Sequence, residues 1–138
     1  MSLEQRLQNV AVLGAGGKMG SGISLLLARE MTLEKIKPEN AGKTYELHLI
    51  DVNPEALEGL KQYLHKQAIK FVQKKADKVQ PLYQQAGKNL EGDALAAAFA
   101  EDMQSILRPT TDVNTAAAAT MVFEAIIENV DIKTSVLK

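Results

Sequence analysis

The sequence predicts an α/β fold in which a mostly parallel sheet is covered by helices. Short apolar runs rich in β-branched residues alternate along the chain with stretches of helical periodicity, and the first run ends at a glycine-dense turn. Such alternation is typical of parallel sheets, because each helix carries the chain back to the edge where the next strand starts. With 138 residues, 46% of them hydrophobic, the chain suits a single domain with its own core.

The first half of the chain contains two predicted strands joined by a glycine turn and a helix. Residues 9–13 form an uncharged apolar run that suits a buried parallel strand. After the turn at residues 14–22, an apolar helical stretch is expected to end near Met31. Residues 32–44 are interpreted as an inserted loop because a proline, an asparagine and a glycine lie within them. The second predicted strand then covers residues 45–50.

A long helix is predicted to start after Asn53, where a capping residue precedes a proline and an acid. Apolar residues keep helical spacing from Leu57 into the seventies. Pro81 and the glycine-containing residues 87–92 are expected to interrupt the chain.

The last third of the chain repeats the alternation with shorter elements. Residues 94–105 predict a helix, and residues 106–112 a short extended segment. A brief helix is expected at residues 115–119, followed by the last strand at residues 121–127. Residues 131–138 then begin another helix.

Composition excludes several classes of function. Sixteen basic and seventeen acidic residues give a net charge of −1, which argues against a bulk nucleic-acid binder. The absence of cysteine excludes disulfides, thiolate zinc sites and cysteine catalysis, and His48 and His65 cannot form a histidine-rich metal site alone. No apolar run is long enough to span a membrane, and the opening residues are too polar for a secretory signal. We therefore expect a soluble, cytoplasmic protein without a metal site.

The turn after the first predicted strand has the glycine pattern of a dinucleotide-binding unit. In such a unit Gly14 permits the tight turn, Gly16 lets a pyrophosphate approach the backbone, and Gly20 lets the helix pack closely. The N-terminus of that helix offers free N–H groups to the phosphates. The spacing G-x-G-x-x-x-G is one residue longer than usual, so Gly17 or Lys18 is expected to bulge beside the phosphate. The alternative is a structural glycine turn in another kind of α/β protein.

Asp51 ends the second predicted strand, where a carboxylate can accept hydrogen bonds from a ribose 2′-hydroxyl. The same charge repels a 2′-phosphate, which predicts NAD rather than NADP as cofactor. Asp51 lies 31 residues beyond Gly20, against about 20 in the usual unit, and the insertion at residues 32–44 accounts for the difference. Asp51 could also serve the start of the following helix, and the two roles are compatible.

Four lysines recur at intervals of four residues on the long predicted helix: Lys66, Lys70, Lys74 and Lys78. Side chains at this spacing share one face of a helix. From the spacing alone, a solvated helix face is the better interpretation. The more specific interpretation is an electropositive surface for a phosphorylated substrate.

Two acids lie at the end of the last predicted strand. Ligands of open α/β sheets bind at the carboxyl ends of strands, so Glu128 lies near the expected site and Glu124 within the strand. A buried carboxylate is costly without a partner, which favours a function for the segment. The alternative for Glu128 is an exposed acid at a helix start, with Asn129 or Asp131 as the cap.

Three segments resemble the NAD-binding domain of the 3-hydroxyacyl-CoA dehydrogenase family: residues 9–23, 49–51 and 122–133. The third is the most similar, since the strand, its acid, the Glu-Asn pair and the following lysine have the family's spacing. The resemblance implies a Rossmann-type, doubly wound sheet over residues 1–138. The family's catalytic groups, and the helical domain that completes the substrate cleft and the homodimer, correspond to none of these residues. The resemblance therefore implies a truncated NAD-binding domain.

The resemblance also assigns roles to individual residues. The cofactor contacts that it implies are Gly14, Gly16, Gly20, Asp51, Ala125, Glu128 and Lys133, and Gly17, Lys18 and Met19 of the same turn are expected to contact the cofactor as well. Basic groups on the family's long helix meet coenzyme A, and Lys66, Lys70 and Lys74 are expected to act similarly. No catalytic residue is assigned.

The implied activity belongs to fatty acid metabolism, as the oxidation of 3-hydroxyacyl-CoA to 3-oxoacyl-CoA. In that reaction a histidine base takes the hydroxyl proton while hydride passes to NAD. The isolated chain is expected to bind NAD weakly and to turn over no substrate. Two alternatives remain open, a dehydrogenase of the 6-phosphogluconate or 3-hydroxyisobutyrate type and a non-catalytic module that senses NAD.

Overall fold

The computed structural model describes residues 8–40, 42–119 and 121–124. Helices separate successive strands along these residues, with α3 and α4 consecutive and two short 3₁₀ helices, η1 and η2, among the elements. In chain order the elements are β1 (Asn9–Leu13), α2 (Lys18–Lys35), η1 (Pro38–Asn40), β2 (Glu46–Ile50), α3 (Pro54–Gln85), α4 (Gly92–Ile106), β3 (Leu107–Thr110), η2 (Val113–Ala118) and β4 (Met121–Glu124).

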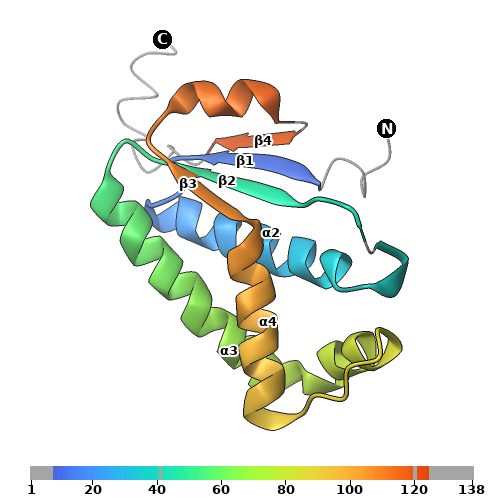
Figure 1. Ribbon diagram of the computed structural model, residues 1–138. Helices are drawn as coiled ribbons and strands as arrows, with labels where there is room; N and C mark the ends of the chain where they lie inside the picture. The colour runs from blue at the N-terminus through green and yellow to red at the C-terminus, as the bar shows by residue number, and fades with distance from the viewer. Residues whose placement is uncertain (1–7, 41, 120, 125–138) are drawn as a thin grey trace.

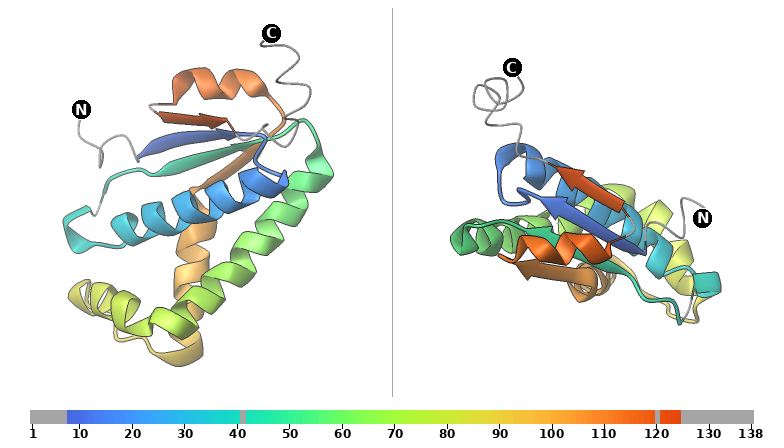
Figure 2. Two further views of the ribbon diagram at one scale, coloured as in Figure 1. Left: turned by 180° about the vertical axis from the view of Figure 1, so that it is seen from behind. Right: turned by 90° about the horizontal axis from the view of Figure 1, so that it is seen from above.

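The described strands form one parallel sheet with the order β3-β2-β1-β4. Helices α2 and α3 cover one face of this sheet, α4 packs against these two helices on the same side, and η2 crosses the other face (Figure 1). The view from behind shows the same division into layers, and the view from above looks onto the sheet with the helices behind it (Figure 2). The predicted α/β class with a parallel, Rossmann-like sheet is therefore confirmed. The order reverses between β1 and β4, and ligands of such sheets bind at the carboxyl ends of strands next to this reversal.

The main core lies between the sheet and the helix layer. Alternate residues of β1 and β2 are completely buried there, because successive side chains of a strand point to opposite faces. The largest core contributions come from Val10, Val12, Leu47 and Leu49 of the strands and from Leu64, Phe99 and Met103 of the helices. Among the described residues, no helix is both long and apolar enough to cross a membrane.

Two expected helix boundaries are wrong. Helix α2 continues to Lys35 instead of ending near Met31, and Thr32 is buried inside it. The Thr32 hydroxyl donates a 2.6 Å hydrogen bond to the carbonyl of Ala28, so the helix satisfies this polar group itself. Pro81 does not interrupt the chain, because it lies on the exposed surface of α3, where water can satisfy the carbonyl that its missing N–H leaves unpaired.

The irregularity in α3 instead occurs at Lys75, six residues before Pro81. Lys75 has φ −128° and ψ 37°, outside the helical region, and divides α3 into two segments. The start of the long helix and the loop after it agree with the sequence-based prediction. Asn53 caps its start through hydrogen bonds from the N–H groups of Glu55 and Ala56, and residues 86–91 form the loop that precedes α4.

Candidate functional site

The glycine turn between β1 and α2 is fastened to the end of β2 by main-chain hydrogen bonds. The N–H groups of Gly14 and Ala15 both donate to the carbonyl of Ile50, at 2.8 and 3.0 Å. Gly14 has φ +73°, a conformation that glycine adopts without steric cost. The N–H of Gly17 closes the turn by donating to the carbonyl of Gly14 at 3.1 Å.

Two further glycines are required by contacts within the chain. A Cβ atom on Gly20 would lie 2.0 Å from the carbonyl oxygen of Gly14, so α2 can approach the turn only without a side chain there. A Cβ atom on Gly16 would lie 2.5 Å from the Cβ of Ala56 and 3.0 Å from Oδ2 of Asp51. The close neighbour of Gly16 in this structure is therefore the first turn of α3.

The start of α2 is open to an anionic ligand. Gly17 is the capping residue and has no side chain to accept from the first turn, which contains no acid. The first N–H groups of a helix have no acceptors within the helix, and they carry partial positive charge. The extra residue of the turn does not form a bulge, because Gly17 becomes the cap and Lys18 the first helical residue. Lys18 and Met19 are both exposed.

Asp51 lies at the end of β2 with its carboxylate held by two main-chain donors. Oδ2 accepts from the N–H of Gly16 at 2.9 Å, and Oδ1 accepts from the N–H of Asn53 at 3.0 Å. The cap of α3 is Asn53, and Asp51 holds the residue that makes it. Each carboxylate oxygen can accept a second hydrogen bond, so Asp51 remains able to receive a hydroxyl from a ligand.

A hollow of about 520 Å³ lies beside this turn, between the first turns of α2 and α3. It is lined by Gly16, Lys18, Ser21, Ala56, Gly59, Leu60 and Tyr63. The structure thus brings the glycine turn, Lys18 and Asp51 together at the carboxyl end of β1 and β2. On the opposite edge of β1 from β2, Glu124 ends β4 in register with Leu13. The other expected cofactor contacts, Ala125, Glu128 and Lys133, lie outside the described residues.

The structure divides the predicted lysine ridge. Lys66, Lys70, Lys74 and Lys78 are all exposed on α3, but Lys78 follows the bend at Lys75. Lys70 and Lys74 line a cavity of about 230 Å³, which we name the basic hollow. Its other lining residues are Leu25, Arg29, Gln67, Ala68, Phe71, Lys75 and Met103. Lys66 lines a different hollow, of about 410 Å³, together with the exposed His65.

Arg29 is a cation of the basic hollow that sequence reasoning missed. Its guanidinium carbon lies 5.3 Å from the centre of the Phe71 ring, the geometry of a cation–π contact. The Phe71 ring packs in turn against Phe99 of α4, with ring centres 5.5 Å apart. Arg29 belongs to α2 and the lysines belong to α3, so no periodicity in the sequence relates Arg29 to the lysines. The packing of α2 against α3 brings these cations together.

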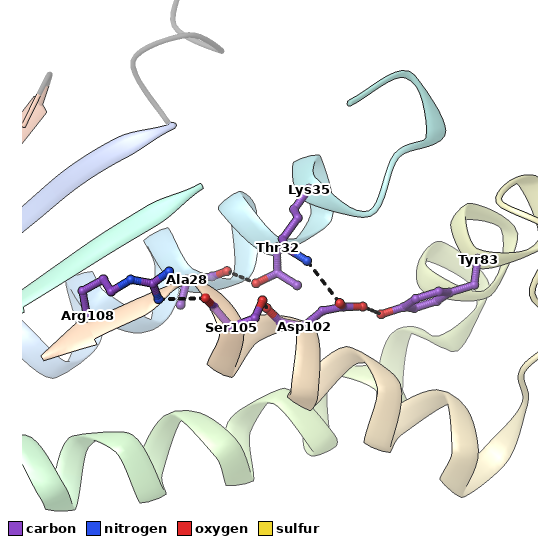
Figure 3. A network of polar contacts seen from close by, with 7 residues as sticks. All are labelled: Ala28, Thr32, Lys35, Tyr83, Asp102, Ser105 and Arg108. Carbon is purple, nitrogen blue, oxygen red and sulfur yellow. Dashed lines mark hydrogen bonds and ion pairs between the residues drawn. The ribbon is translucent and has the colours of Figure 1, made fainter. Parts of the chain in front are cut away.

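A polar network connects the helix layer at a distance from the glycine turn (Figure 3). The hydroxyl of Tyr83 donates to Oδ2 of Asp102 at 2.5 Å, and Nζ of Lys35 lies 3.2 Å from Oδ1 of the same carboxylate. We name these three residues the clasp. Burial, followed by the hydrogen bond to Asp102, raises the pKa of the Tyr83 hydroxyl far above its ordinary value. Tyr83 therefore remains a protonated donor at physiological pH.

Comparison with known proteins gives the same family as the sequence resemblance. Residues 9–138 match the profile of a family described as 3-hydroxyacyl-CoA dehydrogenase, NAD binding domain. The chain is similar to a solved 3-hydroxybutyryl-CoA dehydrogenase from Escherichia coli, with 26% identity and a TM-score of 0.58. It is also similar to FadB2 from M. tuberculosis, with 25% identity and a TM-score of 0.55. A search of curated proteins found no match.

The similarity extends over nearly all of this chain but only part of the solved ones. Both alignments cover 94% of this chain. They cover 21% of the E. coli chain and 34% of the M. tuberculosis chain. The chain therefore spans about a fifth and a third of the lengths of these two proteins.

Proposed function

We propose that this chain, which belongs to the 3-hydroxyacyl-CoA dehydrogenase family through its NAD-binding domain, binds NAD for the oxidation of 3-hydroxyacyl-CoA to 3-oxoacyl-CoA. One observation carries the proposal. The open N-terminus of α2 and the Asp51 carboxylate are joined at the glycine turn by the 2.9 Å hydrogen bond from Gly16. An anion-binding group and a hydroxyl-binding group thus lie side by side, as a nucleotide requires.

The groups at the turn fit the chemistry of NAD. The first N–H groups of α2 and the Lys18 ammonium suit the pyrophosphate, and Asp51 suits the adenosine ribose. The carboxylate opposes a 2′-phosphate, so we assign NAD rather than NADP. NAD supplies the nicotinamide that accepts hydride. In this proposal Gly14, Gly16, Gly17, Met19 and Gly20 complete the cofactor contacts, and Ala125, Glu128 and Lys133 contact the nicotinamide half.

The basic hollow supports an acyl-CoA rather than a small free hydroxy acid as substrate. It places Arg29, Lys70 and Lys74 around a floor that includes Phe71 and Met103. Phosphate groups suit such cations, and a pantetheine or acyl chain suits the apolar floor. Lys66, in the neighbouring hollow, is assigned to the same extended ligand.

The wider proposal concerns the whole enzyme. Residues 1–138 supply one NAD-binding unit, and the base that accepts the hydroxyl proton is assigned to none of them. We also propose that the protein acts in the cytoplasm, in fatty acid metabolism, and forms a homodimer. An assay with 3-hydroxyacyl-CoA and NAD tests this division of labour, because measurable turnover by these 138 residues alone would contradict it.

Calorimetric titration of the chain with NAD and with NADP tests the cofactor assignment. We expect wild type to prefer NAD by at least about tenfold, and Asp51→Asn to lose about tenfold in NAD affinity, since charge-assisted hydrogen bonds contribute about 1.5–3 kcal/mol. Asp77→Asn removes the same charge from an exposed position on α3 and should bind like wild type. A preference for NADP, or an unchanged affinity in Asp51→Asn, would refute the role of Asp51.

A further inference from the structure

The clasp connects the same three helices that line the basic hollow. Lys35 belongs to α2, Tyr83 to α3 and Asp102 to α4 (Figure 3). The hollow likewise takes side chains from all three helices. Asp102 is the central member, because one carboxylate oxygen receives the Tyr83 hydroxyl and the other faces the Lys35 ammonium.

The bend at Lys75 separates the two features along α3. Gln67, Lys70, Phe71 and Lys74 precede the bend, whereas Tyr83 lies in the segment after it. A break in the helical conformation is a point where the two segments can change their relative direction. Together with the buried Val79, the hydrogen bond from Tyr83 to Asp102 therefore contributes to the direction that α3 takes after the bend.

Asp102 does not line the hollow, but it precedes Met103 in α4. Met103 lines the hollow and is only 1% exposed, so the position of this part of α4 determines where the apolar floor lies. On α2, Lys35 follows Arg29 by six residues on the same continuous helix. A single carboxylate of α4 thus contacts side chains of both α2 and α3, the other two helices that line the hollow.

We propose that Asp102 is a positioning residue for the basic hollow, because by holding Lys35 and Tyr83 it fixes the bend at Lys75 and the spacing of the cations. This inference rests on the proposed function of the hollow as the coenzyme A site. Asp102 has no direct contact with the ligand in this arrangement. It acts by setting the positions of Arg29, Lys70 and Lys74 relative to the apolar floor.

Simple electrostatics predicts the opposite effect of replacing Asp102. Removal of a negative charge near a group of cations raises the local positive potential and should strengthen the binding of an anion. A positioning role predicts weaker binding, because the cations would no longer be held at the spacing that the ligand requires. The direction of the change in affinity therefore separates the two effects.

The experiment titrates the full 138-residue chain with coenzyme A and, separately, with NAD. We expect Asp102→Asn to weaken coenzyme A binding by about three- to tenfold without changing NAD affinity. Tyr83→Phe, which changes no charge, should give a loss in the same direction. Asp77→Asn is the matched control, since it removes the same charge from outside the clasp and should bind coenzyme A as well as wild type or better.

The possible results of these titrations lead to different conclusions. Unchanged or tighter coenzyme A binding in Asp102→Asn, or an equal loss of NAD affinity, overturns the positioning role while leaving the function of the hollow in place. If wild type itself does not bind coenzyme A, the proposed function of the hollow fails, and this inference fails with it. If Asp102→Asn does not fold, as judged by circular dichroism, Tyr83→Phe decides alone, because it removes only a hydroxyl and keeps the ion pair of Lys35 with Asp102.

Discussion

The binding groups that we propose for the glycine turn lie mainly on the main chain, whereas those that we propose for the basic hollow lie on long side chains. At the turn, a few neighbouring residues are fixed by hydrogen bonds to Ile50 and by contacts that exclude a Cβ atom. In the hollow, cations from two helices gather above apolar side chains from three. The turn therefore depends on the absence of side chains, and the hollow depends on their presence and spacing.

This difference predicts how each region responds to change. A main-chain site cannot adapt to an added methyl group, because backbone atoms cannot move without moving an entire strand or helix. A site made of exposed lysines tolerates the loss of one cation, since the others still attract the ligand. We therefore expect substitutions at the turn to affect folding, and substitutions in the hollow to affect binding of one ligand.

Gly20→Ala tests the turn with the largest expected effect. The added Cβ would lie 2.0 Å from the carbonyl oxygen of Gly14, so α2 must move away from the turn. We expect a loss of about 3 kcal/mol or more in the free energy of unfolding, or roughly ten degrees in the unfolding midpoint. Gly22→Ala is the matched control on the same helix, because a Cβ there meets nothing within 4 Å. It should stabilise α2 by about 0.5–1 kcal/mol. Equal midpoints for the two variants would contradict this account.

Gly16→Ala tests whether α3 restricts the turn. Its Cβ would lie 2.5 Å from the Cβ of Ala56, and we expect a loss of about 1–3 kcal/mol together with weaker NAD binding. The double variant Gly16→Ala with Ala56→Gly removes the opposing methyl group and should recover part of that loss. Urea unfolding of both single variants and the double variant measures the coupling. Additive losses would show that Ala56 is not the obstacle.

Substitutions in the hollow should separate the two ligands without unfolding the chain. Arg29→Met and Lys70→Met each remove one cation while keeping an unbranched stem of similar length. We expect each to weaken coenzyme A binding by about three- to tenfold and to leave NAD binding unchanged, since exposed charge pairs contribute about 0.2–1 kcal/mol and charged hydrogen bonds somewhat more. In titrations at two salt concentrations, the coenzyme A affinity of the variants should depend less on salt than that of wild type. Unchanged coenzyme A affinity in a variant that carries both Arg29→Met and Lys70→Met would remove the hollow from the substrate site.

The smallest expected effect concerns the pH dependence of the clasp. Burial raises the pKa of Tyr83 above its ordinary value of 10.0 in the folded chain, whereas the unfolded chain releases this proton near the ordinary value. The stability that Tyr83 contributes is therefore complete below about pH 10 and decreases as the pH rises further. Tyr83→Phe should be about 1 kcal/mol less stable than wild type at pH 8, and the difference should narrow at pH 11. Urea unfolding of both proteins at pH 8 and pH 11 measures this difference in stability. A difference that stays the same at the two pH values would contradict the raised pKa of Tyr83.

The features that could be predicted from the sequence are those that are determined by residues close together in the chain. The turn, Asp51 and the cap at Asn53 depend on neighbouring residues and on glycine geometry, so their spacing was informative. The spacing predicts that the cations at residues 66, 70 and 74 share a helix face, but their division between two hollows depends on how α2 and α4 pack against α3.

Features that depend on tertiary contacts could not be predicted. A proline usually indicates a break, yet α3 bends at Lys75 and continues through Pro81. Arg29 has no spacing relation to the lysines that it joins, and its position depends on the Phe71 ring. The clasp unites residues 19 and 67 positions apart in the chain, a separation that no periodicity describes.

The two main-chain bonds to Asp51 also determine how a nucleotide would be received. A carboxylate that already accepts from Gly16 and Asn53 has lost its rotational freedom before any ligand arrives. The entropy of ordering that side chain is therefore part of the free energy of folding rather than of binding. If Asp51 binds the ribose as proposed, its side chain needs no change of rotamer, and we expect the association rate to depend mainly on diffusion and orientation. The amide proton of Gly16 should accordingly exchange slowly with solvent even in the chain without ligand.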